Sequence, residues 1–373
     1  MSKPRAIVSV INDLSTDQRV HKVCSFLTDQ GYDVLLVGRK KRDSVALNQR
    51  PYSTKRMVLL FEKGALFYAF FNLRLFFFLL FRKSQLLVSN DLDTLLPNVL
   101  IARFKRVPLV YDSHEYFTEV PELLSRPKVR RIWERIEQYA FPKLKTVYTV
   151  NQSIAGKYHQ KYHVPIQVVR NVSPLWKPTN IPSKSELGIP ENKHLLIMQG
   201  AGLNIDRGVE EAIAMMHYLN DTVLMLVGDG DIIPAMKQRV EAEQLTEKVL
   251  FFGKRPYAEL MVFTFHADLG LSLDQPTNPN YEFSLPNKVF DYMHAGTPII
   301  CSDVVEVANL VKQHDLGLVL TDYAPEHMAQ LIGHLLSDTD RMHQLKLNCE
   351  KAALIENWEK ETETLQRIYA NVR

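Results

Sequence analysis

The chain of 373 residues has few cysteines, little excess charge and no long uninterrupted apolar run. Its three cysteines, Cys24, Cys301 and Cys349, are scattered without metal-ligand spacing, which predicts free thiols in a reducing compartment. The formal net charge of +3 argues against a nucleic-acid partner. The beginning of the chain lacks the apolar core of a signal peptide. We therefore expect an unprocessed, cytoplasmic protein.

One apolar segment is nevertheless unusual. Residues 66–81 read LFYAFFNLRLFFFLLF, and an Arg-Lys pair follows. A membrane-spanning helix needs about 20 apolar residues, whereas this run is shorter and is interrupted by Asn72 and Arg74. Two interpretations remain open. The segment is either a helix buried on a sheet, or a helix on the inner face of the membrane, with residues 66–83 as a peripheral contact.

Short β-branched runs alternate with helical patterns along almost the whole chain, which predicts parallel sheets with crossover helices. In the first half the runs lie at 6–10, 34–37, 86–89, 109–111, 146–150 and 167–169. In the second half they lie at 195–198, 223–227, 249–252, 269–273, 299–301 and 318–320. The sequence therefore belongs to the α/β class.

The length of the chain favours two domains, because single domains usually stop growing near about 250–300 residues. Pro174, Pro178, Pro182 and Pro190 interrupt a polar stretch, which predicts a linker at 176–192. We expect a Rossmann-like domain at 1–175 and a second one at 193–356. An amphipathic tail helix within 357–373 is expected to pack back onto the first domain.

The stretch 280–300, NYEFSLPNKVFDYMHAGTPII, has the pattern of a phosphate-binding helix start. Pro286 precedes a short helix that is expected to end near Gly296. The helix N-terminus and the charge of Lys288 suit a phosphate group. Asp291 lies three residues further on and shares a helix face with Lys288, where it can accept hydrogen bonds from ribose hydroxyls.

This stretch resembles the donor-binding motif of retaining glycosyltransferases of family 4, in the form P-N-K-x-F-[ED]-Y-x-x-x-G-x-P. The resemblance implies the GT-B architecture, with two Rossmann-like domains facing a central cleft. It also implies that Asn287, Lys288 and Asp291 bind the donor. The family usually has Glu where Asp291 stands. Glu282 lies nine residues before Asp291 instead of eight, so its contact with the donor stays open.

Residues 199–210, QGAGLNIDRGVE, follow a predicted strand and resemble the glycine-containing loop of the same family. The resemblance implies that Gly202 lies near the donor phosphates and that Arg207 pairs with them. Many members carry a further Arg where this chain has Ala201. The alternative is that Arg207 is a surface residue at a helix start.

Residues 110–117, VYDSHEYF, resemble the D-x-H-E loop of the family. The resemblance implies that His114 contacts the transferred sugar, with Asp112 and Glu115 as supports. A histidine at a strand end is often only a loop residue whose hydrogen bonds are satisfied locally.

The first predicted strand and helix also resemble the family, and the loop 12–15 would then lie on the acceptor side. Asp13 or Arg19 could contact the acceptor or the sugar. Equally, Asp17 could be only an N-cap residue, with Arg19 as its local partner. Two D-x-D patterns, at 91–93 and 229–231, are interpreted as a helix cap and a turn, and no metal or cofactor is expected.

Taken together, the motifs predict a retaining, metal-independent glycosyltransferase with His114, Arg207 and Lys288 as catalytic residues. It would move a sugar from a nucleotide-sugar donor to a saccharide or lipid-linked saccharide in cell-surface glycan biosynthesis. Two alternatives remain. One is a non-catalytic relative that binds a nucleotide sugar. The other is a nucleotide-sugar 2-epimerase or hydrolase on the same architecture.

Overall fold

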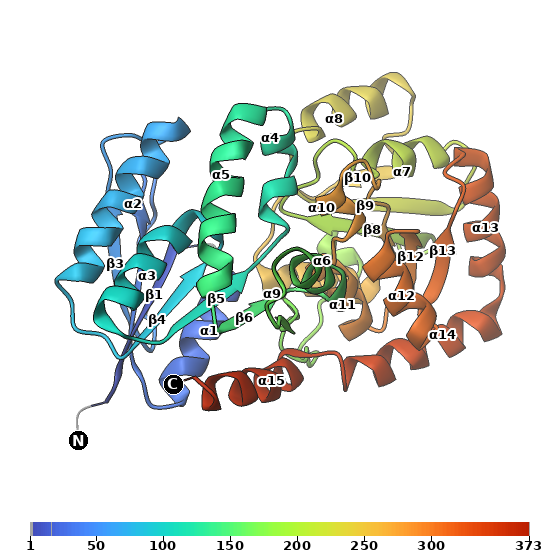
Figure 1. Cartoon of the computed structure of the whole chain (residues 1–373). Coiled ribbons are helices and arrows are strands. Elements are labelled where there is room, and N and C mark those ends of the chain that lie inside the picture. Colours follow the sequence, from blue (N-terminus) through green and yellow to red (C-terminus); the bar gives the residue numbers. More distant parts are fainter. Residues whose placement is uncertain (1–2, 16, 373) are drawn as a thin grey trace. The chain divides into compact units, whose positions relative to one another are not determined.

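The computed structural model describes residues 3–15 and 17–372, so the outermost bounds predicted for the domains lie outside the described residues. The chain divides into two compact units, one of Met1–Arg170 with Thr362–Arg373 and one of Asn171–Glu361. Figure 1 shows strands and helices alternating in both. The stretch 176–192 belongs to the second unit and is irregular apart from one short 3-10 helix, η3 (Ser185–Leu187).

Seven parallel strands form the sheet of the first unit, in the order β3-β2-β1-β4-β5-β6-β7. Their bounds are β1 (Arg5–Asp13), β2 (Asp33–Lys40), β3 (Ser53–Val58), β4 (Leu86–Asn90), β5 (Leu109–Ser113), β6 (Thr146–Thr149) and β7 (Gln167–Val168). The order reverses between β1 and β4. Doubly wound sheets bind ligands at such a point, beyond the carboxyl ends of the strands.

One strand of this sheet, β3, has no counterpart in the sequence prediction. It lies at the sheet edge, and Met57 is its only buried residue. An edge strand needs few apolar side chains, so its sequence lacks the β-branched run that marks the others.

The helices of the first unit include α1, which begins as predicted, because the carboxylate of Asp17 accepts a hydrogen bond from the backbone N–H of Val20 at 3.0 Å. The last helix, α15, begins in the second unit and continues in the first, where the ring of Tyr369 lies 5.7 Å from that of Phe26. The bounds are α1 (Gln18–Asp29), α2 (Gly64–Leu80), α3 (Leu92–Lys105), η1 (Phe117–Glu119), α4 (Pro121–Leu124), α5 (Pro127–Ala140), η2 (Phe141–Lys143), α6 (Gln152–Tyr162) and α15 (Trp358–Ala370).

The apolar segment 66–81 forms most of α2, and it is both buried and exposed. Phe67, Phe71, Leu75 and Leu79, spaced four residues apart, are buried in the core with strand residues of the sheet. Its other faces carry exposed apolar side chains. Among the described residues, no helix is long and apolar enough to cross a membrane.

Six parallel strands form the sheet of the second unit, in the order β10-β9-β8-β11-β12-β13. Their bounds are β8 (His194–Gly200), β9 (Thr222–Gly228), β10 (Val249–Phe251), β11 (Leu269–Ser272), β12 (Ile299–Ser302) and β13 (Gly317–Leu320). The order reverses between β8 and β11. The two sheets therefore confirm the predicted pair of Rossmann-like units.

Helices cover both faces of this second sheet, and each face has its own apolar core. The bounds are α7 (Val209–Met215), α8 (Ile233–Ala242), α9 (Tyr257–His266), α10 (Pro279–Glu282), α11 (Asn287–His294), α12 (Val305–His314), α13 (Pro325–Ser337) and α14 (Thr339–Ala353). Gly208 starts α7 with φ of +82°, and a Cβ there would lie 2.5 Å from the carbonyl oxygen of Leu273. Only glycine lets the start of α7 approach the end of β11 so closely.

Candidate active site

Two clusters of polar side chains lie at the carboxyl ends of the strands, one in each unit, where the strand order reverses. The His114 cluster comprises Arg19, Asn90, Asp91, Asp112 and His114. The Arg207 cluster comprises Arg207, Asp274, Tyr281 and Lys288. A cavity of about 540 Å³ lies at the opposite, amino end of the first sheet, and no predicted site residue lines it.

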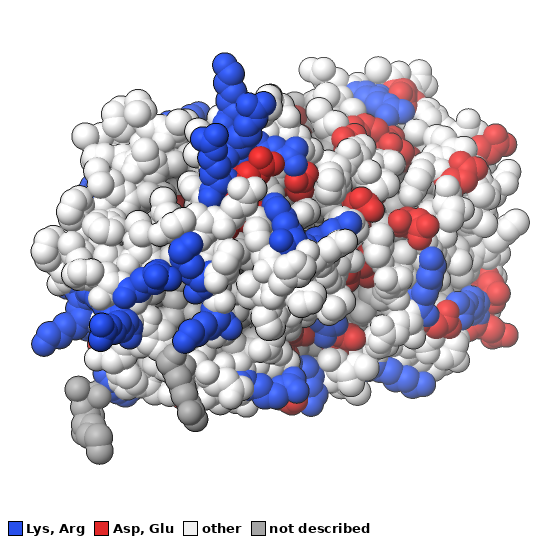
Figure 2. Space-filling model, viewed as in Figure 1, with Lys and Arg blue, Asp and Glu red and all other residues white. Residues whose placement is uncertain are grey.

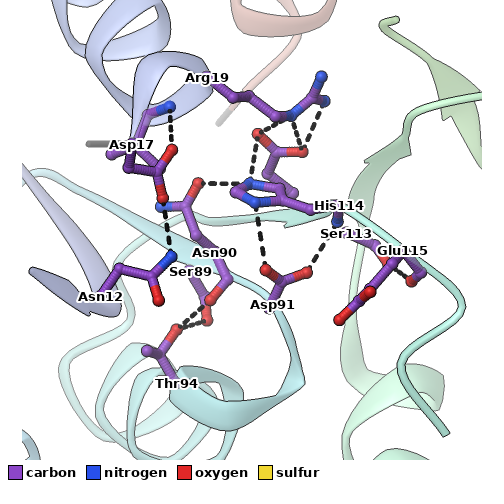
Figure 3. Close-up of polar contacts among 12 residues, drawn as sticks. Asn12, Asp17, Arg19, Ser89, Asn90, Asp91, Thr94, Ser113, His114 and Glu115 are labelled. Carbon is purple, nitrogen blue, oxygen red and sulfur yellow. Dashed lines mark hydrogen bonds and ion pairs between the residues drawn. The ribbon is translucent and has the colours of Figure 1, made fainter. Parts of the chain in front are cut away.

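The His114 cluster contains a buried ion pair (Figure 3). Arg19 in α1 and Asp112 in β5 are almost completely buried. The guanidinium donates from Nη2 to Asp112 Oδ1 at 2.7 Å and from Nε to both carboxylate oxygens at 3.1 Å. Such a bidentate contact fixes the orientation of the carboxylate. Nε and Nη2 of Arg19 are therefore both engaged by Asp112.

His114 lies next to this pair, and 17% of its side chain is exposed. Its backbone N–H donates to Asp91 Oδ1 at 2.8 Å, and its ring Nδ1 lies 3.1 Å from Asp91 Oδ2. Ring Nε2 lies 3.1 Å from Asn90 Oδ1 and 3.5 Å from Asp112 Oδ2. Every ring nitrogen therefore faces an oxygen of the first unit (Figure 3).

These neighbours set the charge of the cluster. Burial lowers the pKa of His114, but the carboxylates of Asp91 and Asp112 outweigh it and raise that pKa to about 9. Burial raises the pKa of Asp112, but Arg19 and His114 outweigh it and hold it below the ordinary aspartate value. From Arg19 through Asp112 and His114 to Asp91, positive and negative groups therefore alternate.

The structure corrects two predictions about these residues. Asp91 stands at the N-cap position of α3, but its side chain makes no capping bond, because both carboxylate oxygens are turned to His114. The alternative in which Arg19 is the local partner of Asp17 is also wrong. Its partner is Asp112, 93 residues away, because α1 packs beside the end of β5.

Asp13 and Glu115 are the other predicted residues of the first unit. Asp13 ends β1, and its carboxylate binds Ser44 and lies 3.3 Å from Arg56 Nη1. Glu115 follows His114, and its backbone carbonyl accepts a hydrogen bond from Ser113 at 2.9 Å. Asp13 is therefore tied to a neighbouring loop and strand.

The Arg207 cluster is built around one buried carboxylate. Asp274 lies two residues beyond β11 and is 2% exposed. Arg207 Nη1 donates to its Oδ1 at 2.8 Å, and Lys288 Nζ lies 3.1 Å from its Oδ2. Burial raises the pKa of Asp274, but the two cations outweigh it and lower that pKa below the ordinary value. Two cations share one carboxylate, which leaves one positive charge in excess.

Arg207 is also held from one side by an aromatic ring. Its guanidinium carbon lies 3.9 Å from the ring centre of Tyr281, within the range of a cation–π contact. Its Nε is buried and has no hydrogen-bond partner among the residues that the structure describes. Arg207 is thus partly buried and oriented, which contradicts the alternative of a free surface arginine.

Asp291 and Lys288 both lie on α11 but have different partners. Pro286 precedes the helix and Gly296 follows it with φ of +69°, as predicted. The carboxylate of Asp291 accepts hydrogen bonds from three side chains at 3.0 to 3.2 Å, namely those of Ser173, Tyr257 and Gln199. A ribose hydroxyl would have to join or replace one of these donors.

The remaining predicted donor residues lie near the same strand ends. Gly202 is exposed in the loop after β8. Asn287 is the first residue of α11, and Glu282 is the last residue of α10. Both are partly buried.

Sequence reasoning missed Asp274 and Tyr281. Asp274 stands just beyond the buried strand β11, on the side where the strand order reverses. A carboxylate directly after the strand next to a reversal point is a signal that could have indicated it. No comparable signal marks Tyr281.

The chain matches two family models. The family model of glycosyl transferases group 1 matches residues 181–352, and that of glycosyltransferase family 4 matches residues 17–172. Together they span most of both units. No curated protein matches the chain in sequence.

Solved structures match the fold over nearly the whole chain. Sucrose-phosphate synthase from Thermosynechococcus elongatus is 16% identical, with 99% of this chain and 98% of that chain covered and a TM-score of 0.78. Anabaena HepE, in complex with UDP and glucose, is 15% identical, with 99% and 100% covered and a TM-score of 0.76. WaaG, a glycosyltransferase involved in lipopolysaccharide biosynthesis, is 16% identical, with 98% and 100% covered and a TM-score of 0.73.

The two family models, one on each sheet unit, and the matching solved folds lead to one conclusion: the chain belongs to the glycosyltransferases of the group 1 type, with the GT-B architecture.

Proposed function

We propose that the enzyme is a retaining glycosyltransferase that works without a metal ion and takes its sugar from a nucleoside diphosphate donor. The observation that carries this proposal is the Arg207 cluster, in which two cations are held together with one excess positive charge. A diphosphate leaving group gains charge as its bond to the sugar breaks. Oriented cations stabilise such a charge most when they are already in place before the reaction.

The start of α11 adds to this phosphate site. The first turn of a helix has free backbone N–H groups and partial positive charge, and Lys288 is the second residue of α11. Arg207, Lys288 and this helix end would together neutralise the diphosphate. A phosphate oxygen of the donor would then take the proton of the acceptor hydroxyl, with attack and departure on the same face of the sugar.

Binding of nucleotides to wild-type enzyme and to Arg207→Ala tests the donor site. Thermal unfolding is measured with UDP, GDP, ADP, CMP and dTDP, each with and without EDTA. UDP is tested first, because the HepE structure holds UDP and glucose. A ligand at 100 times its Kd adds about 2.7 kcal/mol of stability. One nucleotide should stabilise the wild type with or without EDTA, and Arg207→Ala much less.

Arg341→Ala is the matched control, because Arg341 forms a surface ion pair with Asp315 in the same unit. It should keep the nucleotide response of the wild type. If no nucleotide stabilises the wild type, or if binding is lost in EDTA and returns with Mn²⁺, the proposal is wrong in its donor or in its metal independence. The anomeric configuration of the product, read by NMR, decides retention.

We also propose that the acceptor is a lipid-linked saccharide used in cell-surface glycan synthesis and that the enzyme docks on an anionic membrane. The observation is a surface where α2 and α3 end together, since Lys105 Nζ in α3 donates to the carbonyl of Leu79 in α2 at 2.7 Å. Phe81 and Phe104 are 79% and 74% exposed there. Figure 2 shows uncharged surface at the left of the view, with basic side chains along its lower edge.

The charge of this surface has one sign, which favours an anionic lipid surface as its partner. Basic residues flank both phenylalanines, and they are Arg82, Lys83, Arg103 and Arg106. The acidic residues of the span 64–106 are Asp91 and Asp93, which lie at the other end of α3.

Sedimentation with vesicles tests the membrane proposal. Wild type should bind vesicles that contain phosphatidylglycerol more strongly than pure phosphatidylcholine vesicles, and Phe81→Ser with Phe104→Ser should lose that binding. The control is Leu354→Ser with Ile355→Ser, which removes two exposed apolar side chains in the second unit. Absence of binding to anionic vesicles, or equal loss in the control, would contradict this proposal.

A further inference from the structure

The hydrogen-bond acceptors around His114 determine which of its ring nitrogens carry protons. The amide nitrogen of Asn90 donates to the backbone carbonyl of Ser9 at 3.0 Å, so the amide oxygen is the atom that faces His114 Nε2. An oxygen can only accept there, so Nε2 must carry a proton. On the other side, Asp91 Oδ1 already accepts from the backbone N–H of His114, and Oδ2 faces Nδ1. Burial raises the pKa of Asp91, and His114 and its backbone N–H oppose that rise. When Asp91 is ionised, Oδ2 can only accept, so Nδ1 carries a proton as well.

We propose that His114 is a permanent imidazolium that donates a hydrogen bond to an oxygen of the bound sugar and takes no proton during the reaction. Arg19, Asp91 and Asp112 are then positioning residues, because they act through His114. This inference rests on the proposed function and specifies how one of its predicted catalytic residues would work.

Nε2 is the ring nitrogen whose present partner a sugar oxygen replaces more easily. Its hydrogen-bond partner is the neutral amide of Asn90 at 3.1 Å, while the carboxylate oxygen of Asp112 is at 3.5 Å, the limit for a hydrogen bond. Nδ1, by contrast, is held by a carboxylate at 3.1 Å. Because charge-assisted bonds are roughly twice as strong as neutral ones, a ligand replaces the Asn90 contact first.

The charged groups that surround the ring favour the imidazolium. Asp91 and Asp93 come from the start of α3, Asp112 from the end of β5, Glu115 from the loop after it, and Asp17 and Arg19 from the start of α1. Burial raises the pKa of Asp93 well above the ordinary aspartate value, so Asp93 adds little negative charge. Arg19 is the only cation in this set, and Asp112 already neutralises it. Burial and Arg19 lower the pKa of His114, but Asp91 and Asp112 outweigh them and raise it to about 9. At neutral pH the ring therefore has no lone pair with which to act as a general base.

The state of His114 can be observed directly by NMR in the full-length protein. Uniformly ¹⁵N-labelled chain shows the ring nitrogens of its 12 histidines, and the His114 signal is the one lost in His114→Gln. We expect an imidazolium up to pH of about 9. Asp112→Asn should lower the midpoint by at least about one pH unit, because it removes one of the two carboxylates that face the ring.

Asp33→Asn is the matched control, since Asp33 forms an exposed ion pair with Arg5 in the same unit. It should leave the midpoint unchanged. A neutral His114 ring at pH 7.5, or equal shifts in Asp112→Asn and Asp33→Asn, would overturn the proposal. This measurement needs no substrate, so it stands even if no nucleotide donor is found.

Kinetics then distinguish a donor of hydrogen bonds from a general base. With an active donor and acceptor, kcat/KM should stay level to about pH 9 and then fall, and in Asp112→Asn the fall should begin at lower pH. A general base would instead give a rate that rises between pH 6 and 8 and loses this rise in His114→Gln. That second result would refute the proposal even if the NMR midpoint were high.

Discussion

The two polar clusters use buried carboxylates in opposite ways. In the His114 cluster, Arg19, Asp112, His114 and Asp91 alternate in sign, so the charges cancel along the row. In the Arg207 cluster, Asp274 holds two cations, and one positive charge remains. The first arrangement suits a neutral ligand with hydroxyl groups, and the second suits an anion.

In both clusters a more exposed cation lies against a more buried carboxylate. Asp112 is 0% exposed and Asp274 is 2% exposed, while His114 and Arg207 are 17% and 24% exposed in their side chains. A buried ionised group is costly unless it is paired and hydrogen-bonded. Each buried carboxylate is therefore coupled to the accessible cation in front of it, and loss of either partner disturbs the other.

Asp274→Asn should have the largest effect, because it removes the shared carboxylate of the Arg207 cluster. Arg207 and Lys288 would then lie together with no counter-ion, and breaking a buried pair in this way costs about 3–5 kcal/mol. The free energy of unfolding in urea measures it. Asp315→Asn is the control, since Asp315 forms an exposed pair with Arg341, which is worth about 0–1 kcal/mol. Similar losses in both variants would remove the distinction between the cluster and an ordinary surface pair.

The pH dependence of stability should be smaller and should belong to the His114 cluster. The pKa of His114 is about 9 in the folded protein against 6.5 for an ordinary histidine, so its stabilisation is fully present below pH 6.5. It is lost as the pH rises through about 9. The loss amounts to at most about 3 kcal/mol.

Urea unfolding at pH 6.5 and at pH 9 measures this difference in wild type and in His114→Gln. Subtracting the variant removes the contribution of the other titrating groups. An equal decrease in both proteins would mean that His114 carries no excess stabilisation as an imidazolium.

The salt dependence of ligand binding should be the smallest effect, and it should belong to the Arg207 cluster. Raising NaCl from about 0.05 to 0.5 M shortens the Debye length to a few Å and should weaken nucleoside diphosphate binding by less than about tenfold. The partly exposed, positively charged Arg207 cluster is the reason. Calorimetry with the diphosphate and with the uncharged nucleoside measures it. A nucleoside with the same salt dependence would show that the effect is not due to the phosphates.

The sequence by itself determined the sheet strands with apolar cores, the start of α1 at Asp17 and the limits of α11 between Pro286 and Gly296. These features depend on neighbours within a few residues, such as capping side chains, proline and glycine. The motifs also predicted that His114, Arg207 and Lys288 lie near strand ends, because parallel strands place their carboxyl ends at one edge.

Only the tertiary structure decided which group each of these side chains meets. Asp112 is 93 residues from Arg19, and Asp274 is 67 residues from Arg207. Such partners depend on which strands lie next to each other, and the order of strands in a sheet is not written in any local pattern. For the same reason the role of Asp91 as a partner of His114 escaped prediction. The edge strand β3 escaped it because only one of its residues is buried. Long-range packing, and not local propensity, positions the charges of this protein.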